Sequence, residues 1–266
     1  MVLVAMVYTS GYLDARMAEN EFGTNKQFMQ TTALQVDDIA WTIGRTQTVR
    51  YSSRYGAVNF QPDTLTYTVH VTTLDDNPLD FSYSTGIVLY NMPSTEYTLG
   101  NDYFERIFPS DQSDLYPDHG MPFVLSGSTA PISDVYVIEK MDSGSYTRIS
   151  ISPTVRMLKS LITSQTSNQT YVRFYMPLLI SGTNKDHLSQ SVTLIGKDIT
   201  QYTRSNVTRV DITVSYPAAS TGFDADYFRF YQQTMTLDST SDPALPSNSR
   251  VEFYLGTVMV SLGLYA

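Results

Sequence analysis

The sequence predicts a mainly β protein with a long N-terminal α-helix, whose strands form an antiparallel β-sandwich of the Ig-like or jelly-roll-like kind. Two observations predict this class. Phe22, Met29, Val36 and Ile43 recur every seven residues, which is typical of one face of a helix. After Gly56 the hydrophobic period changes to two, and short Tyr-, Thr- and Val-rich segments alternate with turn residues, as in sandwiches and barrels.

The chain divides at residue 50 into an N-terminal helical part, 1–50, and a β-rich domain, 51–266, which has room for two sub-sheets. The helical part opens with an apolar run, 1–8, and continues as an amphipathic helix over 12–47, with a weak point near Gly23. A bilayer span needs about 20 apolar residues, so the run is too short to cross a membrane alone. We interpret it as the lower end of a longer apolar helix; the alternative is a buried first turn.

The predicted strands follow in order along the second part. The clearest are the alternating segment 65–71, the continuous apolar run 86–90 and a hairpin over 136–151. Helical spacing of the aromatic residues in 223–231 predicts one short helix. Further strands are expected at 48–51, 57–60, 123–125, 171–180, 191–195 and 209–216, with two more in 250–265 around a kink or turn at Gly256.

Composition excludes several classes of protein. The net charge is −9 and the pI about 4.7, so the surface repels a phosphate backbone and nucleic acid is not an expected partner. There are no cysteines, which excludes disulfides and thiolate metal sites. Only 16% of residues are charged, whereas Tyr is abundant at 20 residues. Such a polar but weakly charged surface is common where proteins face the cell exterior or pack against copies of themselves.

The sequence contains no catalytic signature. Its three histidines, His70, His119 and His187, are far apart and belong to no metal-binding pair, and the common hydrolase and nucleotide motifs are absent. We therefore expect no enzyme and no cofactor.

One acidic cluster could hold structural calcium. Its carboxylates lie in a Pro-rich region at Asp102, Glu105, Asp111, Asp114 and Asp118. Their spacing matches no known calcium loop, so a solvated acidic loop is the simpler interpretation. Aromatic residues of the same region (Tyr97, Tyr103, Phe104 and Tyr116) leave a carbohydrate site, or less readily a glycosidase, as further alternatives.

Two Asn-X-Thr triplets, at Asn168 and Asn206, fit the acceptor pattern for N-glycosylation and favour an exported glycoprotein.

The order of segments resembles archaeal type IV pilin-like cell-surface proteins. The resemblance lies in the apolar start that passes into an amphipathic helix, in the junction 36–51 (VDDIAWTIGRTQTVRY), and in the aromatic segment 223–233. It implies an extracellular or cell-surface location, a helix that is first a membrane anchor and then the core of a filament, and copies of the chain or related pilin-like subunits as partners.

The sequence thus predicts a non-enzymatic structural protein that is tethered or assembled through its helix; the alternative is a carbohydrate- or calcium-binding surface module. We assign apolar contact to Val2, Leu3, Val4 and Met6, and packing on the body or on a neighbour to Phe22, Met29, Val36 and Trp41.

Overall fold

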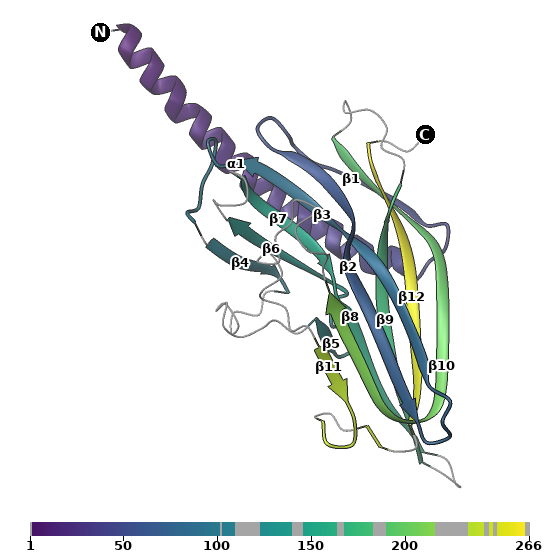
Figure 1. The fold of residues 1–266 in the computed structure, drawn as a ribbon. Helices are drawn as coiled ribbons and strands as arrows, with labels where there is room; N and C mark the ends of the chain where they lie inside the picture. Colours follow the sequence, from purple (N-terminus) through teal and green to yellow (C-terminus); the bar gives the residue numbers. More distant parts are fainter. Residues whose placement is uncertain are drawn as a thin grey trace.

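The computed structural model describes residues 2–101, 103–109, 123–139, 146–163, 168–182, 190–215, 234–241, 245–246 and 249–263, with helix side chains described from Gly11 onward. It shows a mainly β protein with one N-terminal helix, as predicted, and the helix extends beyond the β body at the N-terminal end (Figure 1). The expected short helix at 223–231 lies outside the described residues.

The helix, α1, runs without interruption from Val2 to Ala40, so the predicted weak point at Gly23 does not break it. It ends before the predicted residue 47, because the following residues are needed for strand β1 (Thr46–Arg50), which pairs with β10. Gly44 makes the turn between them with φ +79°, a left-handed conformation that favours glycine, and its N–H donates to the carbonyl of Gly196 at 2.8 Å.

The strands form one sheet in the order β4-β6-β7-β3-β2-β10-β12-β9-β8-β5, with β1 and β11 also paired to β10. Most pairs are antiparallel, but β9–β12 and β5–β8 are parallel, so the sheet is mixed and not purely antiparallel as expected. The remaining strands are β2 (Ala57–Thr73), β3 (Leu79–Pro93), β4 (Tyr103–Phe108), β5 (Val124–Ser126), β6 (Ser133–Glu139), β7 (Tyr146–Pro153), β8 (Val155–Thr163), β9 (Asn168–Ser181), β10 (Ser191–Ser215), β11 (Thr234–Leu237) and β12 (Ser249–Leu262).

Several predicted strands are parts of longer ones. Segments 57–60 and 65–71 both belong to β2, joined across a register shift after Gln61. Segments 191–195 and 209–216 belong to the 25-residue β10, which turns a corner at Asn206 and exchanges β12 for β2 as its neighbour. The two strands expected in 250–265 are the single strand β12, and Gly256 is not a turn. Strands β4, β8 and β11 were not predicted.

Hydrophobic side chains cover both faces of the sheet. One core includes Tyr67 of β2 with Ile87 and Leu89 of β3; the other lies between α1 and the opposite face and includes Val88 and Tyr90. The run 86–90 is therefore continuously apolar because both faces of β3 are buried there. The second core attaches the helix to the sheet.

Candidate functional site

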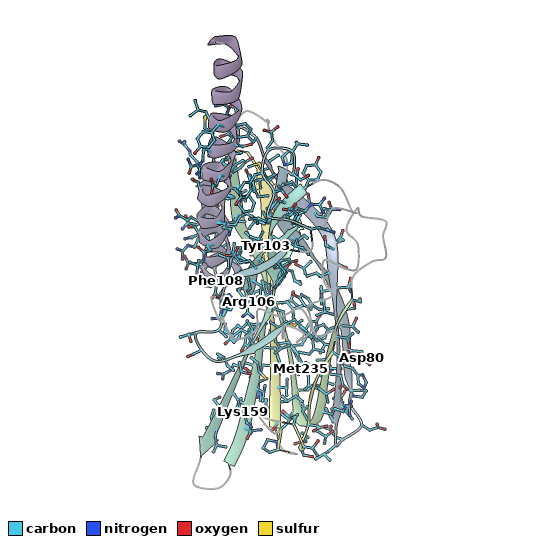
Figure 2. The ribbon with its side chains drawn as sticks, turned by 90° about the vertical axis from the view of Figure 1, so that its left-hand side faces the viewer. Asp80, Tyr103, Arg106, Phe108, Lys159 and Met235 are labelled. Atoms are coloured by element: carbon cyan, nitrogen blue, oxygen red, sulfur yellow. The ribbon has the colours of Figure 1, made fainter. Side chains whose placement is uncertain are left out.

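The most distinctive feature of the molecule is the division of α1 into a projecting part and a docked part. Residues 11–17 are exposed on every side of the helix, whereas from Ala18 onward one face is buried (Figure 2). Helix geometry gives the projecting part, from Val2 to Met17, a length of about 24 Å. Val2, Leu3, Val4 and Met6 all lie in this part; their backbone is helical and their side chains fall outside the described residues.

Apolar side chains dock the second part of α1. Phe22, Met29 and Val36 are 2%, 0% and 0% exposed and belong to the core between helix and sheet. Ala18, Ala33 and Ala40 lie on the same face and are also buried, so that the helix approaches the sheet closely. The seven-residue spacing of Phe22, Met29 and Val36 therefore marks the docked face. The prediction is wrong for Ile43, which lies past the end of α1 and is 62% exposed.

A carboxylate on this buried face ties α1 to the turn before β2. Glu21 is 7% exposed and accepts hydrogen bonds from the backbone N–H groups of Arg54 (2.9 Å), Tyr55 (3.1 Å) and Gly56 (3.0 Å) and from the Tyr90 hydroxyl (2.8 Å). Burial, together with the hydrogen bond to Glu21, raises the pKa of Tyr90, so the phenol stays a donor. We call this arrangement the Glu21 latch.

Asn25, one turn further along, adds a second polar tie to the same turn. Its side chain is fully buried, and its amide nitrogen donates to the carbonyl of Ser52 at 2.8 Å. The sequence analysis missed both Glu21 and Asn25. The available signal was their position, three or four residues from the apolar Ala18, Phe22 and Met29, because a polar residue on a buried face usually has a specific partner.

At the other end of α1, Trp41 lies just past the last helical turn. Its indole N–H donates to Asp37 at 3.1 Å, and its ring meets Tyr175 of β9 edge-on with centroids 5.2 Å apart. Asp37 also pairs with Arg156 of β8. Trp41 thus joins the helix end to the sheet within this chain.

Two glycines allow this close approach. A Cβ atom at Gly196 of β10 would lie 2.3 Å from the carbonyl oxygen of Thr42, and one at Gly256 of β12 would lie 2.4 Å from that of Ala40. Only glycine fits where a helix end touches two strands at this distance.

A groove of about 400 Å³ lies where α1 leaves the body. It is open to solvent, and its walls are more apolar than polar. The helix contributes Tyr12, Ala15, Arg16 and Glu19, and the segment after β3 contributes residues 94–98.

The sheet-side wall of this groove is held by a second buried carboxylate. Glu139, which is fully buried, accepts hydrogen bonds from Thr98 Oγ1 (2.5 Å), Leu99 N–H (2.6 Å) and Thr147 Oγ1 (2.7 Å). The Tyr97 ring packs on Phe22 at 5.0 Å. Hydrogen bonds and ring packing therefore hold the wall of the groove in place.

The predicted calcium cluster is represented here only by Glu105, which lies in β4. Its carboxylate pairs with Lys26 of α1 at 2.6 Å and accepts from the Tyr103 hydroxyl at 3.0 Å, so it connects an edge strand to the helix. Asp102, Asp111, Asp114 and Asp118 lie outside the described residues. Among the residues that are described, no group of three or more His, Cys, Asp or Glu side chains is placed to hold a metal ion.

The two glycosylation triplets lie in different settings. Asn206 is half-buried at the corner of β10, has φ +56° and offers its carbonyl to the N–H of Leu74 at 2.9 Å. Asn168 begins β9, and its side chain falls outside the described residues.

Within the described part of the chain, no helix has the length and hydropathy needed to cross a bilayer. Comparison of the chain with models of known protein families, with curated proteins and with solved structures finds no match.

Proposed function

We propose that this chain is a non-enzymatic structural protein of the cell surface that assembles with copies of itself, or with related pilin-like subunits, through α1. The observation that carries the proposal is the projecting part of the helix: its described side chains, 11–17, belong to neither hydrophobic core, while the same helix continues into the body. Only Asp14, which accepts from the Tyr55 hydroxyl (3.0 Å), and Met17, which lies beside Arg54, bond to the body among the side chains 11–17. An exposed helix of this length gains stability chiefly by packing against another apolar surface.

The chemistry of the projecting part supports association. No charged side chain occurs before Asp14, and Leu13 and Met17 are 54% and 43% exposed. Burying side chains of this kind contributes about 1.5–3 kcal/mol each. A helix with such a surface is suited to contact with other helices or with lipid.

The outward face of the docked part continues this surface. Thr24 and Thr31 are exposed, and their hydroxyls donate to the carbonyls of Asn20 and Gln27 at 2.9 Å, four residues earlier in the helix. Their bonding capacity is thus used locally, and the exposed Leu34 (53%) lies further along. Between residues 20 and 34 a neighbouring helix can pack on this face without desolvating a charge; the exposed Arg16 and Asp38 flank the stretch at its two ends.

The attachment of α1 makes the helix and the sheet one mechanical unit. The Glu21 latch holds the middle of α1, and Trp41 with Gly196 and Gly256 holds its end. If neighbouring subunits fix the orientation of the projecting part, they therefore also fix the orientation of the body. This is what a subunit needs if it displays its β domain in a fixed orientation.

We further propose that the body acts as a sandwich-like unit facing outward. The sheet curls, so that β3 lies near β9 although other strands separate them in the sheet, and the Leu179 N–H donates to Thr85 Oγ1 at 2.8 Å. Asn206 lies at the corner of β10 and would carry any N-linked glycan on this outer body.

The test is a pair of charge substitutions on the projecting part. Leu13→Glu with Met17→Glu should abolish polymer formation, measured by sedimentation and negative-stain electron microscopy, because charges would be buried in the contact. Leu74→Glu, at a more exposed site (66%) in the β2–β3 turn, is the matched control and should assemble normally.

Flotation with lipid vesicles separates assembly from tethering. Binding to vesicles that the double substitution removes, without polymer formation by the unsubstituted chain, would assign the projecting part to a membrane surface instead. Unchanged soluble monomers from all three proteins would refute both forms of the proposal.

The groove favours a surface binding module as the second candidate function. Tyr12 and Tyr97 lie in its walls with Glu19 and Glu96, a combination of aromatic and carboxylate groups that suits a short glycan. Tyr97→Ala should then abolish retention on a glycan array without preventing assembly. Calcium binding is part of the same candidate function. An increase in melting temperature with millimolar calcium that is lost in the double variant Asp111→Ala with Asp114→Ala would support it.

A further inference from the structure

The face of the sheet that carries α1 continues past the end of the helix. Trp41 meets Tyr175 of β9, and Ala40 lies against Gly256 of β12, so α1 reaches no further along this face than these positions. Strands β8, β9, β12 and β10 extend beyond them (Figure 1). Because side chains alternate between the two faces of a strand, every second residue beyond this level lies on the same face as the helix.

The continuation of this face is aromatic and basic on its two central strands. Strands β9 and β12 are paired in parallel, so the side chains of three residues from each strand lie next to one another on this face. We call the following six residues the arginine–tyrosine surface: Tyr171, Arg173, Tyr175, Arg250, Glu252 and Tyr254. They carry two positive charges and one negative charge, in a chain whose net charge is −9.

One carboxylate orients both arginines. Arg173 Nε donates to Glu252 Oε2 at 3.0 Å, and Arg250 Nε lies 3.0 Å from Glu252 Oε1; the Tyr254 hydroxyl also donates to Oε2 at 3.0 Å. Each guanidinium thus faces Glu252 with its Nε atom, and no described residue hydrogen-bonds to the terminal nitrogens of either group. The side chains of Arg173 and Arg250 are 35% and 38% exposed. Two positioned guanidinium ends are therefore accessible to a ligand.

Tyrosine rings frame the two guanidinium groups. The guanidinium carbons of Arg173 and Arg250 lie 5.9 Å and 5.8 Å from the centre of the same Tyr171 ring, within the range of a cation–π contact. Tyr175 and Tyr254 stack on each other with centroids 5.1 Å apart. These contacts hold the side chains in place before a ligand arrives, so less side-chain entropy is lost on binding.

We propose that the arginine–tyrosine surface binds an anionic polysaccharide, a chain of sugars that bear carboxylate or sulfate groups. The planar end of a guanidinium group matches such an anion with two parallel hydrogen bonds. Tyrosine rings supply apolar area for the sugar rings and hydroxyl groups for their polar edges. Tyr171 and Tyr175 are four residues apart on β9, about 13 Å, so the surface suits an extended ligand better than a single ion.

Other classes of ligand fit the surface less well. One excess positive charge in an acidic chain does not offset the repulsion of a nucleic acid backbone. A tightly packed protein partner would have to desolvate the ion pairs of Glu252, which is costly, whereas a hydrated polysaccharide leaves water between the groups. The surface lies past the end of α1 and does not involve its projecting part, so the proposal is independent of the proposed function.

Native electrophoresis of the full chain in gels that contain a polysaccharide tests the proposal. We expect polygalacturonate, dextran sulfate or both to retard the protein, and neutral dextran not to; retardation should weaken as sodium chloride is added. Retardation by polygalacturonate alone would assign a carboxylated ligand, and retardation by dextran sulfate alone a sulfated one. Equal mobility in all three gels would overturn the proposal.

Substitutions locate the binding on the surface. Arg250→Gln and Tyr171→Ala should each weaken binding about tenfold, whereas Tyr171→Phe, which keeps the ring, should bind nearly as well as the unsubstituted chain. Arg54→Gln is the matched control. Arg54 is also exposed, lies 3.6 Å from a carboxylate oxygen of Asp14 and sits over the Tyr55 ring at 5.0 Å, but it lies near the other end of the docked part of α1.

Two results with these variants would contradict the assignment. If Arg54→Gln weakens binding as much as Arg250→Gln does, the attraction is a general effect of charge and not a site. If Arg250→Gln leaves the retardation unchanged but reduces self-association in sedimentation, the surface is a contact between chains. Melting temperatures of all variants confirm that each protein is folded at the temperature of the assay.

Discussion

The carboxylate of Glu21 accepts hydrogen bonds from four donors. Three of them are consecutive backbone N–H groups, of Arg54, Tyr55 and Gly56, and the fourth is the Tyr90 hydroxyl. Removing the side chain leaves the buried N–H of Gly56 and hydroxyl of Tyr90 without this acceptor, which costs more than the loss of one bond. Glu21 thus joins α1 to two separate parts of the body, the turn before β2 and strand β3.

We predict that Glu21→Ala lowers the free energy of unfolding by about 3 kcal/mol and Glu21→Gln by about 1–2 kcal/mol, because the amide keeps one acceptor oxygen. Urea unfolding measures the stability, and amide exchange in 18–25 reports local loosening of α1. Glu19→Ala is the control, since Glu19 is exposed and lies two residues away. Equal stability of Glu21→Ala and Glu19→Ala would show that the latch is unimportant.

Glu252 of β12 predicts a pH dependence. Its carboxylate is 6% exposed; burial acts to raise its pKa, but hydrogen bonds from Arg173 (3.0 Å) and Tyr254 (3.0 Å) outweigh burial and hold the pKa below its usual value. A carboxyl whose pKa is lowered by folding stabilises the fold above its unfolded value, about 4.3, and this stabilisation is lost as the pH falls through the folded value.

Glu252→Gln should therefore be less stable than the unsubstituted chain at pH 7, and the difference should shrink below about pH 4. Thermal melts at a series of pH values measure it. Exposed Asp80 on β3 offers the control, because Asp80→Asn should change the melting temperature little at any of these values. A difference that is constant with pH would contradict the ionic role of Glu252.

At the level of elements, the end of α1 depends on the two glycines beneath it. Gly256→Ala would bring a Cβ to 2.4 Å from the carbonyl of Ala40 and 2.9 Å from the Trp41 ring. We predict a loss of about 1–3 kcal/mol from this overpacking, with Trp41 fluorescence altered because the indole must move. Gly23→Ala is the matched control: nothing lies within 4 Å of its added Cβ, so it should stabilise α1 by up to about 1 kcal/mol. Loss of stability in both variants would contradict this explanation.

The sequence predicts elements well where burial follows a local period. The spacing of Phe22, Met29 and Val36 identifies the docked face of α1, and the run 86–90 identifies the doubly covered part of β3. It fails where distant segments decide the structure. The end of α1 depends on β1 pairing with β10, and the continuity of β10 through Asn206 depends on an exchange of neighbours. The parallel pairing of β9 with β12 cannot be recognised from the local sequence of either strand.

At the scale of the whole molecule, the sequence again predicts those parts of the candidate site that depend on local composition and misses those that depend on distant residues. The uncharged beginning of α1 could be read from the sequence, because its composition differs from that of the charged turns that start at Asp14. The Glu21 latch and the groove could not, because each joins residues far apart in sequence.

The division of α1 predicts that the body folds without the projecting part. Deleting residues 2–13 should shift the melting temperature by less than about 2 °C, because Tyr12 and Leu13 are exposed and lie outside both hydrophobic cores. Phe22→Ala, which removes a ring that is 2% exposed, should cost about 3–5 kcal/mol. The deletion should nonetheless abolish assembly, whereas Phe22→Ala at a temperature where it stays folded should not.

Thermal denaturation and sedimentation of the same samples measure the two effects separately. A deleted chain that melts far lower would mean that residues 2–13 pack on the body, and the projecting helix would then be a structural element of the fold. A deleted chain that still polymerises would place the contacts between subunits on the β body. If the deleted chain keeps its stability and loses assembly, the result agrees with a helix whose second part packs in the core and whose first part contacts other subunits. No other combination of the two measurements agrees with this division.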